Sequence, residues 1–323
     1  MHKKKLKAAL VEVPPVFLNL NESIGRARSI AAECRENEAG LIVFPETWFP
    51  GYPVWLDDAP AAGLWDHPPV KRLYQYLTEN AVEIGSKEFE DLREIATSSA
   101  AYLVLGIHER DGGTLYNTTV YFSPEGDFRI HRKLVPTFTE RLIWGMGDGS
   151  TLNVLETPYG NLGGLICWEH WMPLARAAMH AKREAIHTAQ FPTVHERHQI
   201  ASRQYAFEGQ CFVLASGCVM TKKDVLEGFE SLNTGDREVF DLLESMRNEK
   251  LQRGGSAIIS PDISYIAEPV FDNRGIVYGE LDLDLVKQGN LLLDTDGHYS
   301  RPDVFRLHVN TEKNENVVFQ PGL

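Results

Sequence analysis

Short runs of aliphatic and β-branched residues alternate along this chain with longer amphipathic stretches. This alternation is typical of an α/β fold, in which helices cover the faces of a sheet. No Pro/Ser-rich linker or repeat divides the pattern, which predicts one domain over residues 1–323. The predicted helices span residues 21–37, 87–98, 173–182 and 196–208, and the predicted strands span residues 6–13, 41–44, 101–107, 118–122, 128–132, 162–166, 185–187, 212–215 and 257–259.

Three of the predicted strands lead into a side chain that is able to do chemistry. Glu46 follows the apolar run at residues 41–44, Lys133 follows the basic segment at residues 128–132, and Cys167 ends the apolar run at residues 162–166. We therefore expect an acid, an amine and a thiol to converge at strand ends. Cysteine attacks as the thiolate, and a nearby cation such as Lys133 lowers the thiol pKa from about 8.5 toward neutrality. Glu46 is then the candidate base.

The segments around these residues resemble the Glu-Lys-Cys triad of the carbon-nitrogen hydrolase (nitrilase) superfamily in order and spacing. They read FPETWFPGYP around Glu46, HRKLVPT around Lys133 and GGLICWEH around Cys167. The resemblance continues through ERLIWGMGDGS and DGHYSRPDVF, and it favours the nitrilase branch over the amidases. It implies a four-layer α-β-β-α sandwich, which periodicity alone does not separate from a doubly wound single sheet. It also implies homodimers or larger spiral homo-oligomers.

Each triad residue also has an ordinary structural interpretation. A lone cysteine is more often a buried core thiol, but two glycines precede Cys167 and Trp168-Glu169 follow it, which favours a nucleophile. Glu46 ends a strand too apolar to be exposed, where an unpaired carboxylate is costly. Lys133 by itself also fits a basic turn, so only the resemblance singles it out.

The resemblance assigns Glu140 as a second active-site carboxylate, which orients the lysine and the substrate. A salt bridge from Glu140 to Arg141 or Arg132 is the alternative. Glu169 is expected to support the architecture, and the role of His170 stays open. Four aromatic residues flank the triad motifs and predict an apolar pocket that suits an aliphatic or aromatic nitrile. These residues are Trp48, Trp144, Trp168 and Phe191.

The predicted reaction forms a thioimidate on Cys167, then a thioester, and releases a carboxylic acid and ammonia. Three alternatives stay open: an aliphatic amidase or carbamoyl hydrolase with the same triad, a nitrile hydratase-like activity that releases amide, and a catalytically idle scaffold or binding relative. No cofactor is expected. Five histidines between residues 170 and 198 form no zinc motif, so no metal is expected either.

Composition narrows the choice of partners and compartment. The net charge of -13 argues against a nucleic-acid partner, because phosphate binding needs a basic face. No uninterrupted apolar stretch approaches the roughly 20 residues that a spanning helix needs, so no membrane partner is expected. Four cysteines in a chain of 323 residues predict reduced thiols rather than a disulfide framework, and hence a cytoplasmic protein.

Two segments interrupt the alternation of strands and helices. Residues 51–74, rich in Pro, Trp and Asp, suggest either a pocket rim or an ordinary surface loop. Residues 221–253 carry mixed charge and suggest either a solvated insertion or an oligomer contact, with a short helix near residues 239–246. The C-terminal extension from about residue 296 is a further candidate for oligomer contacts. Asn21 is the predicted cap of the first helix.

Overall fold

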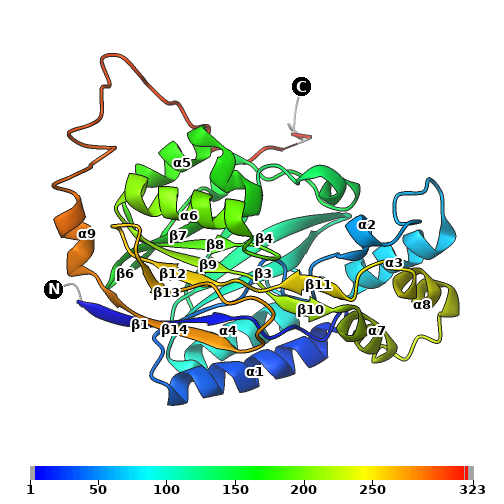
Figure 1. Cartoon of the computed structure of the whole chain (residues 1–323). Helices are drawn as coiled ribbons and strands as arrows, with labels where there is room; N and C mark the ends of the chain where they lie inside the picture. Colours follow the sequence, from blue (N-terminus) through cyan, green and yellow to red (C-terminus); the bar gives the residue numbers. More distant parts are fainter. Residues whose placement is uncertain (1–3, 316, 319–323) are drawn as a thin grey trace.

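The computed structural model describes residues 4–315, 317 and 318, and it consists of two six-stranded sheets packed face to face (Figure 1). The first sheet has the order β14 (Ile276–Asp282), β1 (Lys5–Val11), β2 (Leu41–Val43), β3 (Tyr102–Asp111), β4 (Thr114–Phe122) and β5 (Phe128–Arg132). The second has the order β13 (Tyr265–Ala267), β12 (Ala257–Ile259), β9 (Phe212–Ser216), β8 (Glu184–Gln190), β7 (Gly160–Ile166) and β6 (Leu155–Thr157).

Three apolar layers hold the two sheets and their helices together. Leu10 and Val43 of the first sheet meet Ile186 and Leu214 of the second in the central layer. On the outer face of the first sheet, α1 (Leu20–Glu36) packs against α4 (Lys87–Ser99). On the outer face of the second sheet lie α5 (Pro173–His180) and α6 (Glu196–Gly209) (Figure 1). The predicted four-layer α-β-β-α sandwich is therefore confirmed.

The central strands are apolar on both faces because each sheet is covered on both sides. In β1, Ala9 and Val11 belong to the outer layer, whereas Leu6, Ala8 and Leu10 belong to the central one. A strand buried on both faces has a continuous apolar sequence, which made the central strands predictable. All nine predicted strands are present, with bounds shifted by a few residues.

The strand β14 was not predicted from the sequence, although it pairs with β1 along its whole length from Lys5↔Asp282 to Val11↔Ile276. It lies at the edge of the sheet, and six of its seven residues are half-buried or exposed, Leu281 being the exception. Its sequence therefore lacks the apolar run of a central strand. The first helix also differs from expectation, because its cap is Asn19 and not Asn21: the Asn19 Oδ1 accepts from the Glu22 amide at 3.2 Å.

The two segments that interrupt the sequence pattern pack against each other. The first forms α2 (Trp55–Asp58) and α3 (Pro68–Glu79), so a surface loop is the wrong description of its second half. The second forms β10 (Val219–Thr221), α7 (Lys222–Glu230), α8 (Arg237–Glu244) and β11 (Lys250–Arg253). Helices α3 and α8 are in contact, and Arg72 Nε donates to Asp236 Oδ2 at 2.6 Å across them (Figure 1).

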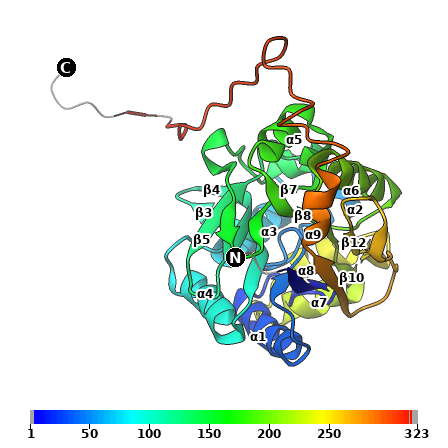
Figure 2. The same ribbon diagram turned by 90° about the vertical axis from the view of Figure 1, so that its left-hand side faces the viewer.

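The chain after α9 (Asp284–Gly289) has no helix or strand among its described residues. Figure 2 shows this tail running away from the two sheets past α5. Its contacts with the rest of the chain include those from Arg183 Nε to Asp296 Oδ2 at 2.8 Å, from Thr295 Oγ1 to the Glu208 carbonyl at 3.2 Å and from the Asn314 amide to Asp148 Oδ2 at 2.8 Å. None of the helices in the described part of the chain is long and apolar enough to cross a membrane.

Candidate active site

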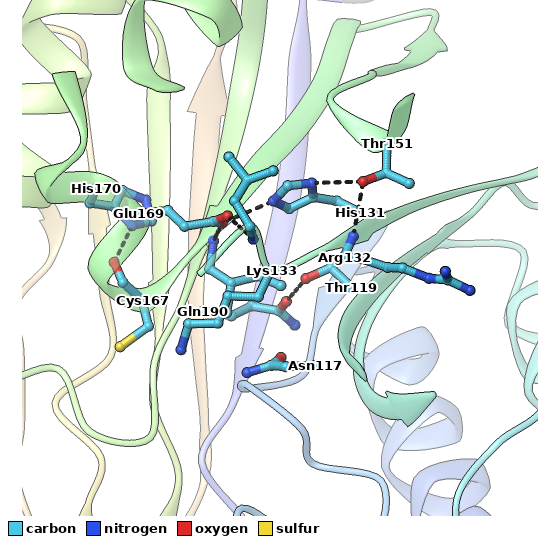
Figure 3. Close-up of polar contacts among 12 residues, drawn as sticks. Asn117, Thr119, His131, Arg132, Lys133, Thr151, Cys167, Glu169, His170 and Gln190 are labelled. Atoms are coloured by element: carbon cyan, nitrogen blue, oxygen red, sulfur yellow. Dashed lines mark hydrogen bonds and ion pairs between the residues drawn. The ribbon is translucent and has the colours of Figure 1, made fainter. Parts of the chain in front are cut away.

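Glu46, Lys133 and Cys167 all lie just beyond strand ends, as the sequence predicts. Glu46 follows β2 and Lys133 follows β5, both in the first sheet, whereas Cys167 follows β7 in the second. The site is therefore built by both sheets, and Figure 3 shows Lys133 and Cys167 at its two sides. The charges of Glu46 and Lys133 both act on the Cys167 thiol, which places the three groups in one electrostatic cluster.

The ammonium of Lys133 lies between two carboxylates. Its Nζ is 2.8 Å from Glu46 Oε1, 2.7 Å from Glu140 Oε2 and 3.0 Å from Glu140 Oε1. All three side chains are buried. Glu140 therefore pairs with Lys133, and the alternative salt bridge to Arg141 or Arg132 is not formed; Arg132 instead binds Glu109. Removing a cation from between two buried carboxylates would leave uncompensated charge, so this group is held together strongly.

Both carboxylates have further donors that the sequence did not single out. The Asn117 Nδ2 donates to Glu46 Oε1 at 2.7 Å from the middle of β4. The Tyr52 hydroxyl donates to Glu140 Oε1 at 2.8 Å, and the Thr137 amide donates to Glu140 Oε2 at 2.6 Å. The other oxygen of Glu46, Oε2, has no hydrogen-bond partner in the described structure. That free oxygen is available to take a proton.

Cys167 lies at a sharp turn from strand to helix. Its φ is +52°, in the left-handed region that a residue with a side chain seldom adopts, and it opens the 3-10 helix η3 (Cys167–Trp171). Close packing behind the turn requires a glycine, because a Cβ at Gly164 would lie 2.3 Å from the Thr188 carbonyl oxygen. The turn presents a thiol that is only 4% exposed at the wall of a cavity.

The electrostatics of the site keep the resting thiol protonated. Burial, with a contribution from Glu140, raises the pKa of Glu46 to about 7 in spite of Lys133. Burial also raises the pKa of Cys167 well above its ordinary value, and Glu46 raises it more than Lys133 lowers it. Burial by itself lowers the pKa of Lys133. The charges of Glu46, Cys167 and Glu140 raise this pKa by more than burial lowers it, so Lys133 stays an ammonium.

The expectation that Lys133 brings the Cys167 pKa toward neutrality is therefore wrong. The cation is already shared by Glu46 and Glu140, and two carboxylates around one ammonium leave the cluster negative. A thiolate added to a buried, negative cluster is unfavourable. The arrangement can instead transfer the thiol proton to Glu46 during attack, because Glu46 has a free oxygen and a pKa near neutrality.

Glu169 joins the two sides of the site. Its Oε1 accepts from the Leu134 amide at 2.7 Å, and its Oε2 accepts from the Ile166 amide at 2.6 Å (Figure 3). His131 Nε2 lies 2.9 Å from the same Oε2. Although burial opposes ionisation, His131 and the two amides lower the pKa of Glu169 below its ordinary value. The ionised Glu169 carboxylate thus joins Leu134, the residue after Lys133, to Ile166, the residue before Cys167.

The carbon-nitrogen hydrolase family profile matches residues 7–290. This chain belongs to the carbon-nitrogen hydrolase family. It is 37% identical over 316 residues to an aliphatic nitrilase of Sinorhizobium fredii, covering 97% of this chain and 98% of that protein, and 36% identical over 315 residues to nitrilase 2 of Arabidopsis thaliana, covering 97% and 91%. A carbon-nitrogen hydrolase structure from Helicobacter pylori superposes with a TM-score of 0.69 at 17% identity, covering 94% of this chain and 98% of that one, which supports the fold.

This carbon-nitrogen hydrolase has a cavity of about 280 Å³ that reaches Cys167. Its walls come from both segments that interrupt the sequence pattern, as well as from the ends of the sheets. Residues 51–74 contribute to this wall as a pocket rim would, whereas the sequence left a rim and a surface loop equally open. The lining residues are Tyr52, Val54, Asp57, Asp58, Thr137, Phe138, Thr139, Glu140, Cys167, Trp168, Pro192, Thr193, His195, His198, Asn248, Lys250, Leu251 and Gln252.

Of the four aromatic residues expected around the substrate, Trp168 lines this cavity and is 41% exposed. Trp48 is buried instead in the core, where its indole donates to the Val13 carbonyl at 2.7 Å. Trp144 and Phe191 are also buried: Lys133 Nζ lies 5.8 Å from the Trp144 ring, and Phe191 stacks on His198 at 4.6 Å. The structure places these three behind the wall, because aromatic residues near a motif serve the core as readily as a pocket.

The contacts of Glu169 predict a strong effect of an isosteric change in this carbon-nitrogen hydrolase. The side-chain amide of Glu169→Gln has one acceptor oxygen, whereas the Glu169 carboxylate has two. Its NH₂ group would therefore point at a backbone amide or at His131, where the carboxylate accepts a hydrogen bond. An unsatisfied buried donor costs about 1–3 kcal/mol of unfolding free energy. We expect a loss of that size by urea denaturation at fixed protein concentration, with activity reduced as well. The exposed Glu156→Gln on β6 is the matched control, and equal losses in both variants would contradict the assignment.

Proposed function

We propose that this enzyme is a nitrilase, which converts a nitrile and two waters into a carboxylic acid and ammonia. The observation that carries the proposal is the buried Glu46–Lys133–Glu140 cluster with Cys167 beside it at a cavity wall. Full-length identity of 36–37% to proteins named as nitrilases supports the nitrile as substrate. We assign Cys167 as nucleophile, Glu46 as base, Lys133 as the cationic donor and Glu140 as the residue that holds Lys133.

In the first half of the proposed reaction, the Cys167 sulfur attacks the nitrile carbon while its proton passes to Glu46. One π bond of the nitrile breaks as the carbon–sulfur bond forms, and the nitrogen becomes negative. The Lys133 ammonium stabilises this charge, and the nitrogen takes the proton that Glu46 received from the thiol, which gives a thioimidate and restores the Glu46 carboxylate. Lys133 is suited to this role because its fixed contacts with Glu46 and Glu140 orient it before the substrate arrives.

In the second half, Glu46 takes a proton from water and the hydroxide adds to the thioimidate carbon. The tetrahedral intermediate expels ammonia after its nitrogen is protonated, and a thioester on Cys167 remains. A second water, activated in the same way, releases the carboxylic acid and restores the thiol. If the tetrahedral intermediate expels sulfur instead of ammonia, the product is the amide, so the same residues account for both outcomes.

The cavity wall carries both apolar and polar side chains. Trp168, Pro192 and Leu251 are among its apolar residues, whereas Asp57 and Lys250 are among its charged ones. Apolar lining residues can hold the body of a small nitrile, and fixed polar groups can orient it. We propose aliphatic or aromatic nitriles without a charged substituent next to the reacting carbon.

A panel of aliphatic and aromatic nitriles with their amides tests the proposed reaction. We expect ammonia and acid in equal amounts from nitriles, measured together with amide, and no product from Cys167→Ala. Cys218→Ala is the matched control, because Cys218 is a buried thiol outside the cavity lining. Turnover of amides alone would move the protein to the amidase or carbamoyl hydrolase alternative. Amide without acid would indicate a hydratase-like outcome, and no turnover would indicate an idle relative.

The position of Glu46 predicts an acidic limb in the pH profile. Burial raises the pKa of Glu46 to about 7, and only its ionised form accepts the thiol proton. The active fraction therefore falls as pH decreases through 7, and kcat/KM should drop toward tenfold per pH unit below it. Glu46→Gln should lower kcat/KM by about 10²–10⁴-fold and remove the limb. A wild-type profile that is flat from pH 5 to 8 would exclude Glu46 as the base.

We also propose that residues 1–323 form one domain whose C-terminal extension from about residue 296 contributes to a homodimer or larger spiral homo-oligomer. Exposed apolar side chains on this extension, including Tyr299, Val304 and Phe305, support this contact. Light scattering should return a mass at least twice that of one chain, and a monomer would refute the proposal.

Four unpaired cysteines support a reducing compartment, and we propose the cytoplasm.

A further inference from the structure

A row of buried polar side chains begins at the Cys167 turn. His170 Nδ1 lies 2.8 Å from the Cys167 carbonyl oxygen, a contact drawn as a dashed line in Figure 3, and His170 Nε2 lies 2.9 Å from His187 Nε2. His187 Nδ1 lies 3.0 Å from both oxygens of Glu184, and the Tyr205 hydroxyl donates to Glu184 Oε2. All four side chains are buried, and none of them lines the cavity at Cys167.

The direction of each hydrogen bond in this row follows from its fixed end. A carbonyl oxygen only accepts, so His170 Nδ1 carries a hydrogen and its Nε2 is the acceptor in the neutral ring. His187 must then donate from Nε2, which leaves its Nδ1 as an acceptor facing Glu184. A carboxylate cannot donate to that nitrogen. If His187 is neutral, the hydrogen between His187 and Glu184 therefore comes from a protonated Glu184.

Counting hydrogens leads to the same result. Tyr205, neutral Glu184, neutral His187 and neutral His170 each supply one hydrogen, and the row has four contacts to fill. If the row loses one proton, three hydrogens remain for four contacts. One pair of acceptor atoms then lies within contact distance with no hydrogen between them, whichever tautomers the two imidazole rings adopt. A buried pair of that kind is unfavourable. An imidazolium at His187 beside a Glu184 carboxylate would hold the same number of hydrogens. Burial, however, lowers the pKa of His187 well below its ordinary value, so the shared proton lies on Glu184, which is an uncharged acid.

We propose that His170, His187 and protonated Glu184 are positioning residues, which orient and polarise the peptide group between Cys167 and Trp168. The hydrogen bond from His170 ends on the carbonyl of this peptide, and the amide of the same peptide belongs to Trp168 at the cavity wall. Trp168 lies in the first turn of η3, where a backbone amide has no acceptor within the helix. A hydrogen bond to a carbonyl strengthens its amide as a donor.

This inference rests on the proposed function, because the Trp168 amide would stabilise the negative nitrogen or oxygen that forms after attack by Cys167. Preorganised donors at such a position contribute to kcat rather than to substrate binding. The turn at Cys167 has a φ of +52°, so it needs outside contacts to keep its orientation. The row from His170 to Tyr205 supplies such a contact through the hydrogen bond from His170 to the Cys167 carbonyl.

The surroundings of Glu184 favour the uncharged acid. A Cβ at Gly163 would lie 2.3 Å from Glu184 Oε1, so the missing side chain makes room for the carboxyl group. Burial raises the pKa of Glu184 to about 8, although the hydrogen bond from Tyr205 lowers it. The titratable or charged groups around Glu184 come from α5, α6, β4, β5, β8 and the neighbouring segments: His180, Arg183, His187, Tyr205, Glu208, Cys211, Tyr121, His131, Asp294 and Asp296.

Glu184 also has a route for exchanging its proton. It lines a second cavity of about 110 Å³ together with His180, Glu208 and Asp296, on the outer side of the second sheet. Protonation of Glu184 can therefore follow the bulk pH without passing through the cavity at Cys167. A rise of pH through about 8 removes the proton that the row requires, and this predicts an alkaline limb distinct from the acidic limb of Glu46.

Glu184→Gln separates the charge of Glu184 from its hydrogen bonds. The glutamine amide donates to His187 Nδ1 and its oxygen accepts from Tyr205, so all contacts stay filled at every pH. We expect activity within about twofold of wild type at pH 7 and no fall of kcat above pH 8, with the acidic limb unchanged. Glu184→Leu, which fills no contact, should lower kcat about tenfold with KM unchanged. An alkaline fall shared by wild type and Glu184→Gln would overturn the proposal.

His170 offers a second comparison, in which the bond to the Cys167 carbonyl is kept or removed. His170→Asn retains a donor for that carbonyl, whereas His170→Leu does not. We expect kcat to fall about tenfold in His170→Leu and to be partly restored in His170→Asn, because the oriented amide stabilises the transition state. Equal kcat losses in the two variants, or a loss confined to KM, would contradict a positioning role.

An infrared measurement needs no activity. Wild-type protein labelled with ¹³C-carboxyl glutamate should show the carbonyl band of a protonated acid that persists at pH 7.5 and disappears as pH rises through about 8. Because Glu46 also titrates near pH 7, the spectrum of Glu184→Gln is subtracted to assign the band. Absence of a band in this difference spectrum would overturn the proposal. Failure to hydrolyse nitriles, with the band present, would count against the proposed substrate only, and the pH profiles would then be recorded with the amides that are turned over.

Discussion

The single ammonium of Lys133 between two buried carboxylates is the interaction on which the site depends. It lies on the first residue after β5, and through Glu46 and Glu140 it fixes side chains from two other segments of the chain. Without it, two buried carboxylates would face each other with no compensating charge, which is unfavourable. Because Glu46 and Glu140 share the Lys133 ammonium, too little positive charge remains to ionise the Cys167 thiol. The thiol therefore reacts by transferring its proton during attack, not as a preformed thiolate.

The sandwich makes this cluster possible because its two sheets contribute different chemistry to one place. The first sheet brings the charged groups, and the second brings the thiol on a strained turn. Glu169 connects them through backbone amides on each side. Three apolar layers hold the two sheets in a fixed arrangement. Because Glu46 and Cys167 lie on different sheets, this arrangement also fixes the distance between them.

The sequence predicted the parts of the structure that follow from local pattern. Strands buried on both faces gave continuous apolar runs, and the residues that end them included Glu46, Lys133 and Cys167. Asn117 escaped prediction because it is one polar residue in the middle of a strand, with no motif around it. Trp48 was assigned to the pocket for its nearness in sequence, whereas its side chain points into the core. The thiol pKa depends on burial and net charge, which only the assembled site defines.

The contact between α3 and α8 has a consequence for how relatives of this enzyme can diverge. Both segments supply walls of the cavity, and the pair Arg72–Asp236 ties them together outside it. Neither segment contributes to the two sheets that hold the triad. Apart from Tyr52, which donates to Glu140, these segments lie outside the charged cluster, so substitutions on them change the cavity wall and leave the triad in place. Transplanting both segments as a unit is then the natural route to a new substrate range, and transplanting either one separates partners that fit each other.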